Sequence, residues 1–388
     1  NISLDSEGDW DRLPFLNKEL LLETPLEERT FVPPEAVDMF VSTSGTSGKP
    51  PLFTPRVLFP DIPHREEFFS VTKPALSVIG YQHRIEAYMA SIGCRPYVIQ
   101  IDPRRMDASI RLAAAVGVES IAAPTFLMPA IIDTMHRLGL KLDIRYMDLT
   151  SEGCSQALYA RIRGAFPRAM VVVVYGLTEI EYPSVAISCE ASEGEHLTET
   201  LHGYGDLHHL ELIDPENGQT LRPRKGVEGE LVVSADLPMP SAFPVIRYRT
   251  GDMVRIVEER CARHGHWSFE VLGRLAQDFV RAAGGTFRAD ALIQAIKSVG
   301  HPLMDDFELH LHEDKARSYV EARLCLRVAE ACDMRVIAER IAHSLAVSPK
   351  EMYADGVADG RFAPLICETL NDAPTLAKRK RIVRHELP

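Results

Sequence analysis

The sequence predicts an α/β protein with two domains, a large one over residues 1–272 and a small α+β domain over residues 273–388. Three observations predict this organisation. Apolar runs alternate with helical patterns through the first two thirds of the chain. After Glu190 the pattern changes to short strands and turns, which indicates a β-rich subdomain over about 190–272. Beyond Gly273 the sequence alternates like antiparallel strands and contains an amphipathic helix.

The large domain begins with alternating strands and helices. Strands are predicted at 75–81, 95–102, 118–124, 142–150 and 169–176, and helices at 82–93, 106–117, 125–139 and 154–166. Because strands with apolar runs alternate with helices, we expect a sheet covered by helices on both faces.

The rest of the chain is richer in strands. Short strands and turns are predicted within 209–221, 228–236, 245–257 and 267–274, and the turn "DPENGQ" within the first of these ranges marks a hairpin. In the small domain, strands are predicted at 307–314 and 318–328 and a helix at 332–345. One face of that helix carries the apolar residues Met334, Ile337, Ile341 and Leu345.

Composition excludes several classes of protein. The 388 residues are 46% apolar and 25% charged, as in ordinary globular domains, and the net charge of −12 argues against a general nucleic-acid binder. Seven scattered cysteines favour a reducing, cytoplasmic location over a disulfide framework. There is no apolar run of about 18 residues, so no membrane span is predicted. The first residue is not Met, and we expect a preceding N-terminal segment.

The segment "VSTSGTSGKP", residues 41–50, is typical of a loop that binds phosphate. It is not a Walker loop, because Gly45 and Gly48 are too close together and Lys49 is followed by Pro50, which has no hydroxyl for Mg²⁺. Glycines let the backbone approach closely, and successive N–H groups and hydroxyls can surround an anion. An ordinary flexible Ser/Gly/Thr loop is the alternative.

Polar motifs follow two of the predicted strands. "YGLTE" places Thr178 and Glu179 after a buried strand, where a hydroxyl and a carboxylate could hold a phosphate and its Mg²⁺. "RYRTGD" ends another strand with Asp252, which could accept hydrogen bonds from a ribose diol, and Arg274 follows at the start of the small domain. Taken singly, Thr178 could be a helix cap and "TGD" a turn.

Together these motifs resemble the adenylate-forming superfamily of acyl-CoA synthetases, peptide-synthetase adenylation domains and luciferases. The likeness is strongest to the phenylacetate–CoA ligase branch. It rests on the lead-in "LPFLNKELLLETPLEER" and on "TSGTSGKP", "YGLTE", "GELVV" and "PVIRYRTGD", and extends from about Leu13 to the C-terminus. The resemblance implies ATP-dependent activation of a carboxylic acid as acyl-AMP, with release of pyrophosphate.

The resemblance also implies roles for individual residues. Tyr175 would stack on adenine, Thr178 would contact the α-phosphate, Glu179 would hold Mg²⁺, and Asp252 would bind ribose with support from Arg274. The remaining ATP-binding residues would be Thr43, Ser44, Gly45, Thr46, Ser47, Gly48, Lys49, Ser151, Glu152, Gly153 and Gly176. An acid pocket is expected near Ala123, Thr125, Phe126 and Glu152.

The C-terminal run "TLAKRKRIVRH" resembles the ending that carries the family's mobile catalytic lysine. Lys378 falls on that lysine, which bridges the carboxylate and the α-phosphate, and Arg381 on the following arginine. A solvated basic tail is the alternative.

The sequence departs from the family at the hinge and in the segment after Lys49, which looks shortened. Ala276 and Gln277 stand where the family has its hinge residue, so Asp278 could replace the hinge or the second step could differ. Some members of the branch bind a structural zinc, and here Cys189, His196, Cys261 and His264 could supply a four-ligand shell. Unrelated polar loop residues are the alternative.

The expected enzyme uses ATP and Mg²⁺ to adenylate an aryl acid and transfers the acyl group to CoA. An amine, nitrite or a carrier protein is the alternative acceptor, as in amide- or diazo-forming biosynthesis. A non-catalytic nucleotide-binding paralogue is a further alternative. We expect no nucleic-acid or membrane partner; a homodimer is one candidate assembly, and the sequence does not identify the oligomeric state.

Overall fold

The computed structural model of the chain divides into two compact units. Unit 1 comprises Asn1–Thr250 and Arg255–Val271, and unit 2 comprises Gly251–Val254 and Leu272–Pro388. The structure describes residues 10, 12–43, 50–57, 75–78, 98–151, 153–154, 156–180, 185–189, 197–203, 208–235, 241–262, 265–275, 278–300, 303–314, 317–328, 332–348, 350–370 and 381–386. The predicted helix at 82–93 lies outside these residues.

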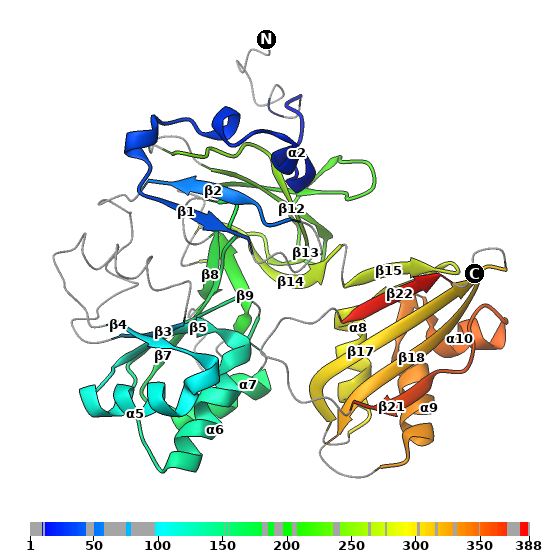
Figure 1. Cartoon of the computed structure of the whole chain (residues 1–388). Helices are drawn as coiled ribbons and strands as arrows, with labels where there is room; N and C mark the ends of the chain where they lie inside the picture. Colours follow the sequence, from blue (N-terminus) through cyan, green and yellow to red (C-terminus); the bar gives the residue numbers. More distant parts are fainter. Residues whose placement is uncertain are drawn as a thin grey trace. The chain divides into compact units, whose positions relative to one another are not determined.

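A 12-stranded sheet dominates the structure (Figure 1). Its order is β11-β10-β12-β13-β14-β9-β8-β7-β6-β5-β3-β4. The strands are β3 (Ala75–Val78), β4 (Val98–Ile101), β5 (Ser120–Pro124), β6 (Tyr146–Thr150), β7 (Met170–Tyr175), β8 (Ala186–Cys189), β9 (Leu197–Gly203), β10 (His208–Ile213), β11 (Thr220–Leu221), β12 (Glu228–Ala235), β13 (Tyr248–Glu258) and β14 (Ser268–Arg274). The pairs among β3 to β7 are parallel, and the pairing turns antiparallel at β8.

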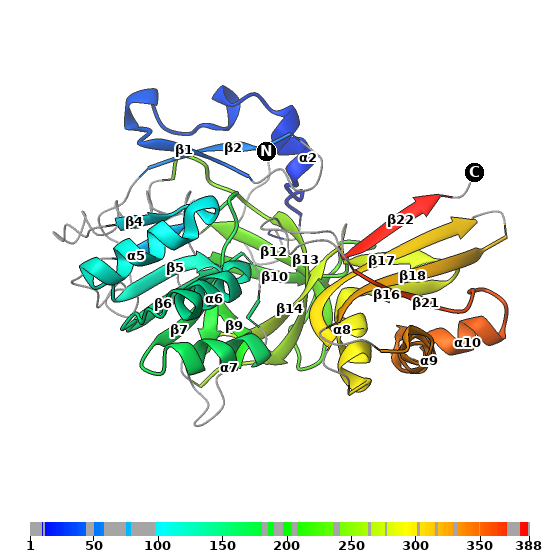
Figure 2. The ribbon, with the colours of Figure 1, turned by 60° about the horizontal axis from the view of Figure 1, so that its bottom comes forward.

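Three helices lie side by side along the parallel strands (Figures 1 and 2). They are α5 (Met106–Val116), α6 (Met128–Leu138) and α7 (Gln156–Ala165). Gly117 and Gly139 end α5 and α6 in the left-handed region, with φ of 71° and 63°, a conformation that favours glycine. Ile110 on α5 and Ile131 on α6 are fully buried. The predicted α/β fold with a β-rich extension is confirmed.

The N-terminal part of unit 1 adds a short helix and a hairpin. The helix is α2 (Lys18–Glu23), and the hairpin pairs β1 (Met39–Ser42) antiparallel with β2 (Phe53–Arg56). Leu16, just before α2, is hydrogen-bonded to the start of β13. Its N–H donates to the carbonyl of Arg247 at 3.0 Å, and its carbonyl accepts from the N–H of Arg249 at 2.8 Å.

Unit 2 contains a four-stranded sheet of order β21-β18-β17-β22, with helices on one face (Figure 2). Its elements are β15 (Phe279–Ala282), β16 (Gly285–Arg288), α8 (Ala289–Ser298), β17 (Leu303–Asp314), β18 (Tyr319–Val328), α9 (Met334–Ser344), β19 (Ala346–Ser348), β20 (Glu351–Met352), α10 (Tyr353–Ala358), β21 (Ile366–Thr369) and β22 (Ile382–Glu386). The core includes the fully buried Phe287, Leu309, Leu324 and Ile341. Unit 2 therefore has a core of its own.

Three histidines lie together on the β17–β22 pair. His310 Nδ1 is 3.1 Å from His385 Nε2, and the rings of His312 and His385 stack with centroids 4.5 Å apart. Burial, and then the charges of His312 and His310, lower the pKa of His385 below its ordinary value of 6.5. Glu308, 3.5 Å from His310 Nε2, is an anion next to this cluster.

Replacement of His385 with glutamine is expected to reduce the acid sensitivity of unit 2. Because folding lowers the pKa of His385, the unfolded chain binds a proton more readily, and stability falls as the pH decreases through about 6.5. Amide hydrogen exchange of β17 should accelerate between pH 7.5 and pH 5.5, after correction for intrinsic exchange, and less so in the variant. An equal acceleration in both proteins would show that His385 is not the source of the acid sensitivity.

Candidate nucleotide site

The β1–β2 hairpin carries the predicted phosphate loop at its turn. Residues 44–49 lie outside the described residues, but the structure describes both ends of the loop. Thr43, which is buried, donates its N–H to the carbonyl of Leu52 at 3.0 Å, and its hydroxyl accepts from the N–H of Leu52 at 2.9 Å. The two ends of the loop are therefore held together by main-chain and side-chain hydrogen bonds.

The carboxyl ends of β5, β6 and β7 lie next to one another at one edge of the parallel sheet. Pro124 is in register with Thr150, and Leu149 with Val173. The hydroxyl of Thr125, which is fully buried, donates to the carbonyl of Thr150 at 3.2 Å. This edge is where ligands bind in sheets of this kind.

Several sequence-predicted residues follow these strand ends. Ala123 is buried in β5, and Phe126 is half-buried in the 3₁₀ turn Thr125–Leu127 that follows. Ser151 and Gly153 are exposed after β6, and Ser151 has a φ of 78°. Tyr175, Gly176, Thr178 and Glu179 are at or after the end of β7. The expected acid-pocket and adenine segments therefore lie on neighbouring strands.

The turn after β7 positions Thr178 and Glu179. It is closed by a hydrogen bond of 3.1 Å from the N–H of Ile180 to the carbonyl of Leu177. Thr178 is half-buried, and Glu179 is buried, with 8% of its surface exposed. Tyr175 presents its ring edge-on to Phe269, with centroids 6.0 Å apart. A buried carboxylate at a strand end requires a positive partner.

The hairpin and the turn after β7 are joined through Thr178. The hydroxyl of Thr54 donates to the carbonyl of Thr178 at 3.2 Å, and the guanidinium of Arg56 donates to the same oxygen. Both side chains come from β2 and are buried. The structure therefore holds the base of the phosphate loop beside Thr178 and Glu179.

Lys18, the first residue of α2, contacts both of these segments. Its Nζ is 3.3 Å from the hydroxyl of Thr43 and 3.8 Å from Glu179 Oε1. Sequence reasoning gave no role to Lys18, Thr54 or Arg56. In the sequence, Lys18 stands out only because it belongs to the lead-in that resembles the family. Thr54 and Arg56 lie outside every motif of the resemblance.

The predicted ribose-binding pair belongs to unit 2. The prediction that Asp252 ends a strand is wrong, because β13 continues through it to Glu258. Arg274 Nε is 3.1 Å from Asp252 Oδ1, and Asp252 is 3% exposed. Asp278 accepts from the N–H of Arg274 at 2.8 Å and donates its own N–H to the carbonyl of Arg274 at 2.7 Å. Gly273, with a φ of 134°, precedes this turn, and a Cβ there would meet Asp278 at 2.6 Å. The turn at Asp278 therefore fixes the main chain of Arg274.

Other predictions lie wholly or partly outside the described residues. They concern Glu152, the hinge positions Ala276 and Gln277, Lys378, and the side chains of Cys189, His196 and His264. Cys261 is described; it is buried, and its N–H donates to the carbonyl of His266 at 2.7 Å. Among the described residues, no group of three or more ligating side chains is arranged for a metal ion. The zinc site stays a prediction.

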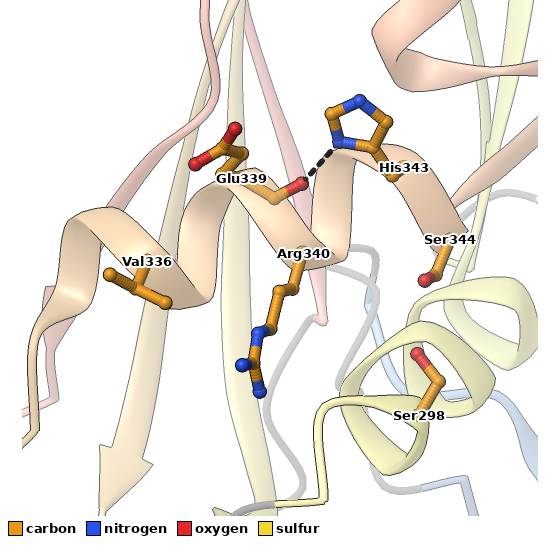
Figure 3. A pocket seen from close by; sticks show the side chains of 6 residues that line it. All are labelled: Ser298, Val336, Glu339, Arg340, His343 and Ser344. Carbon is orange, nitrogen blue, oxygen red and sulfur yellow. Dashed lines mark hydrogen bonds between the residues drawn. The ribbon is translucent and has the colours of Figure 1, made fainter.

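A depression of about 520 Å³ lies between α8 and α9 in unit 2 (Figure 3). Its lining consists of Ser298, Val336, Glu339, Arg340, His343 and Ser344. His343 Nδ1 lies 2.8 Å from the carbonyl oxygen of Glu339 on the same helix. None of the lining residues is among the predicted site residues, so we assign the nucleotide site to the strand ends instead.

Comparison with solved structures identifies the class of fold. The chain matches a 2-hydroxyisobutyryl-CoA ligase in the postadenylation state with a TM-score of 0.71, at 15% identity, over 98% of this chain and 82% of the other. It matches the anthranilate CoA ligase AuaEII, in complex with anthranoyl-AMP, with a TM-score of 0.58, at 14% identity, over 87% and 64% of the two chains. The fold is that of the adenylate-forming acyl-CoA ligases.

Curated relatives agree with this class. The chain is 27% identical over 277 residues to phenylacetate–coenzyme A ligase of Aromatoleum evansii, and 24% identical over 269 residues to that of Thermus thermophilus. These matches cover 66% and 65% of this chain but 58% of each relative. No protein-family model matches the sequence. The resemblance to the phenylacetate–CoA ligase branch is confirmed, and the chain spans less than two thirds of the length of these relatives.

Within the described part of the chain, no helix has the length and apolar character needed to cross a membrane.

Proposed function

We propose that the protein activates a carboxylic acid with ATP and transfers the acyl group to CoA. The observation that carries the proposal is the convergence of Thr43, Thr178 and Glu179, from the base of the phosphate loop and the end of β7. The CoA ligases among its structural and sequence relatives support the reaction class.

The proposed reaction has two steps. An oxygen of the carboxylate attacks the α-phosphorus of ATP, forming a C(O)–O–P bond as the bond to the β-phosphate oxygen breaks and pyrophosphate leaves. The CoA sulfur then attacks the acyl carbon, AMP leaves, and the thiol proton is lost. The residues of the chain contribute by positioning the reactants and by stabilising the charge that develops.

The residues at the β7 end fit a Mg²⁺ ion as well as a phosphate. Glu179 supplies a buried carboxylate oxygen, which is the kind of ligand that Mg²⁺ prefers. The ammonium of Lys18 already lies 3.8 Å from that carboxylate, so a positive charge is accommodated there. Glu179 would hold the ion, which would neutralise phosphate charge when bound. Thr178 would orient the α-phosphate, Tyr175 would stack on adenine, and Asp252 with Arg274 would hold the ribose.

Two finer parts of the proposal concern the acid and the acceptor. An aryl acid is favoured because the relatives include phenylacetate–CoA ligases and an anthranilate CoA ligase, although a 2-hydroxyisobutyryl-CoA ligase is also similar. An amine, nitrite or a carrier protein is a second candidate acceptor, since Ala276 and Gln277 replace the usual hinge residue.

Acid-dependent release of pyrophosphate tests the proposal. Phenylacetate, benzoate, anthranilate and 2-hydroxyisobutyrate should be compared as substrates, and at least one should release pyrophosphate from ATP. Glu179→Gln should retain the fold but require more Mg²⁺, because the variant lacks the charged ligand. The absence of release with every acid would favour a non-catalytic nucleotide-binding protein.

The acceptor is tested with the acid that works best. CoA, an amine, nitrite and a carrier protein are each offered separately, and the products are analysed by mass spectrometry. Stoichiometric thioester with CoA alone supports the proposal. A product formed only with another acceptor would replace CoA in it.

A further inference from the structure

The main chain on both sides of Lys18 is held by hydrogen bonds. Asn17 caps α2, since its side-chain oxygen accepts from the N–H of Leu20 at 2.9 Å. Leu21, on the same short helix, is 4% exposed. Leu16 is tied to β13 on the other side by the two main-chain hydrogen bonds given above. The main chain at Lys18 is thus held from both directions, which fixes the direction of its Cα–Cβ bond.

The ammonium lies between two groups of the proposed nucleotide site. It is 3.3 Å from the hydroxyl of Thr43, the first of the predicted phosphate-binding residues of the loop, and 3.8 Å from Glu179 Oε1. The side chains of Lys18 and Glu179 are 24% and 10% exposed, so this charge pair is partly screened from water. In the nucleotide-free chain the ammonium is a counter-charge for this buried carboxylate.

The same ammonium is suited to a second partner. Lysine is a compact point charge on a flexible four-carbon stem, and it binds phosphate in that form. If a divalent ion neutralises Glu179 when ATP enters, the ammonium is released from the carboxylate. The nearest new anions are then the phosphates next to Thr43, because Thr43 begins the loop.

We propose that Lys18 is a phosphate-binding residue of this site, which pairs with Glu179 in the empty protein and with the β- and γ-phosphates in the ATP complex. This inference rests on the proposed function. Lys18 thereby discriminates ATP and pyrophosphate from AMP, which lacks the two outer phosphates.

Lys18→Met is expected to weaken the binding of ATP and of pyrophosphate by about tenfold or more, because a charged hydrogen bond is lost. The affinity for AMP should change less than twofold. Calorimetric titration of the purified protein with each ligand, in the presence of Mg²⁺, measures both effects. Lys18→Arg should retain most of the affinity for ATP. Lys225→Met, at an exposed lysine in the turn before β12, is the matched control and should change neither affinity.

The outcomes separate this inference from the proposed function. Equal losses for ATP and AMP, or no loss for either, would show that Lys18 serves the structure alone, and would overturn the inference while leaving the proposed function in place. Failure of the wild-type protein to bind any of the three ligands would overturn both. Thermal unfolding checks that Lys18→Met is folded, and Lys18→Gln, which keeps a polar contact to Thr43, replaces it if it is not.

Discussion

Replacement of Lys378 with alanine is expected to slow acyl-AMP formation by about 10²–10³-fold, because a preorganised charged donor is removed from the point where negative charge develops. The resemblance implies that this lysine contacts both the attacking carboxylate and the α-phosphate. The fold should be unaffected, since an alanine is well tolerated in a polar segment. Pyrophosphate release, measured at saturating acid and ATP, gives the rate.

Two controls make the assignment of Lys378 specific. The reaction of supplied acyl-AMP with CoA should survive in the Lys378→Ala variant, because the second step does not use this lysine. Lys380→Ala should leave the rate of acyl-AMP formation nearly unchanged. If Lys380 is essential and Lys378 dispensable, the alignment is displaced by two residues. If neither matters, the basic run is a solvated tail.

Replacement of Arg247 with methionine is expected to destabilise unit 1 by about 3–5 kcal/mol, because it leaves the buried Glu211 without its counter-charge. The two side chains are 2% and 4% exposed, and Arg247 Nη2 lies 2.8 Å from Glu211 Oε1. The guanidinium also donates to the carbonyl of Leu13 at 2.8 Å and lies 4.2 Å from the centre of the Phe15 ring. Methionine keeps much of the packing volume but none of these bonds.

Urea unfolding followed by tryptophan fluorescence reports on this change in unit 1, because both tryptophans of the chain, Trp10 and Trp267, belong to that unit. Arg255→Met is the matched control. Its salt bridge to Glu228, with side chains 38% and 28% exposed, should contribute only about 0–1 kcal/mol. Similar losses in the two variants would show that burial does not determine the strength of the Arg247 pair.

The sequence predicts the parts of this protein that depend on local patterns. The apolar run at 169–176 followed by Thr178 and Glu179 identifies β7 and a polar strand end, since both the burial and the chemistry lie within a few residues. The alternation at 307–314 and 318–328 predicts β17 and β18 for the same reason. These elements and the superfamily are confirmed, whereas the roles of individual site residues stay predictions.

Features made by distant segments could not be predicted. Nothing near Lys18 in the sequence indicates that it meets Thr43 and Glu179, because those contacts exist only once α2, β1 and β7 are assembled. β22 was not predicted, because its residues continue the basic run that carries Lys378. It becomes a strand by pairing with β17, where Ile382 is in register with Leu309. α8 was missed for a different reason: Ala289, Leu292 and Ile296 recur with a helical period that is visible in the sequence, but no helix was predicted there.

The contacts of Trp10 have a consequence for how the chain is made. Its indole N–H donates to Glu211 at 3.1 Å and its carbonyl accepts from Arg247 at 3.3 Å, across 201 and 237 residues of chain. A ribosome adds about 5–20 residues per second, so the segment around Trp10 is synthesised roughly 10–50 s before Arg247. During that interval its apolar side chains have no native partner. The segment around Trp10 is therefore among the last parts of unit 1 to reach its place.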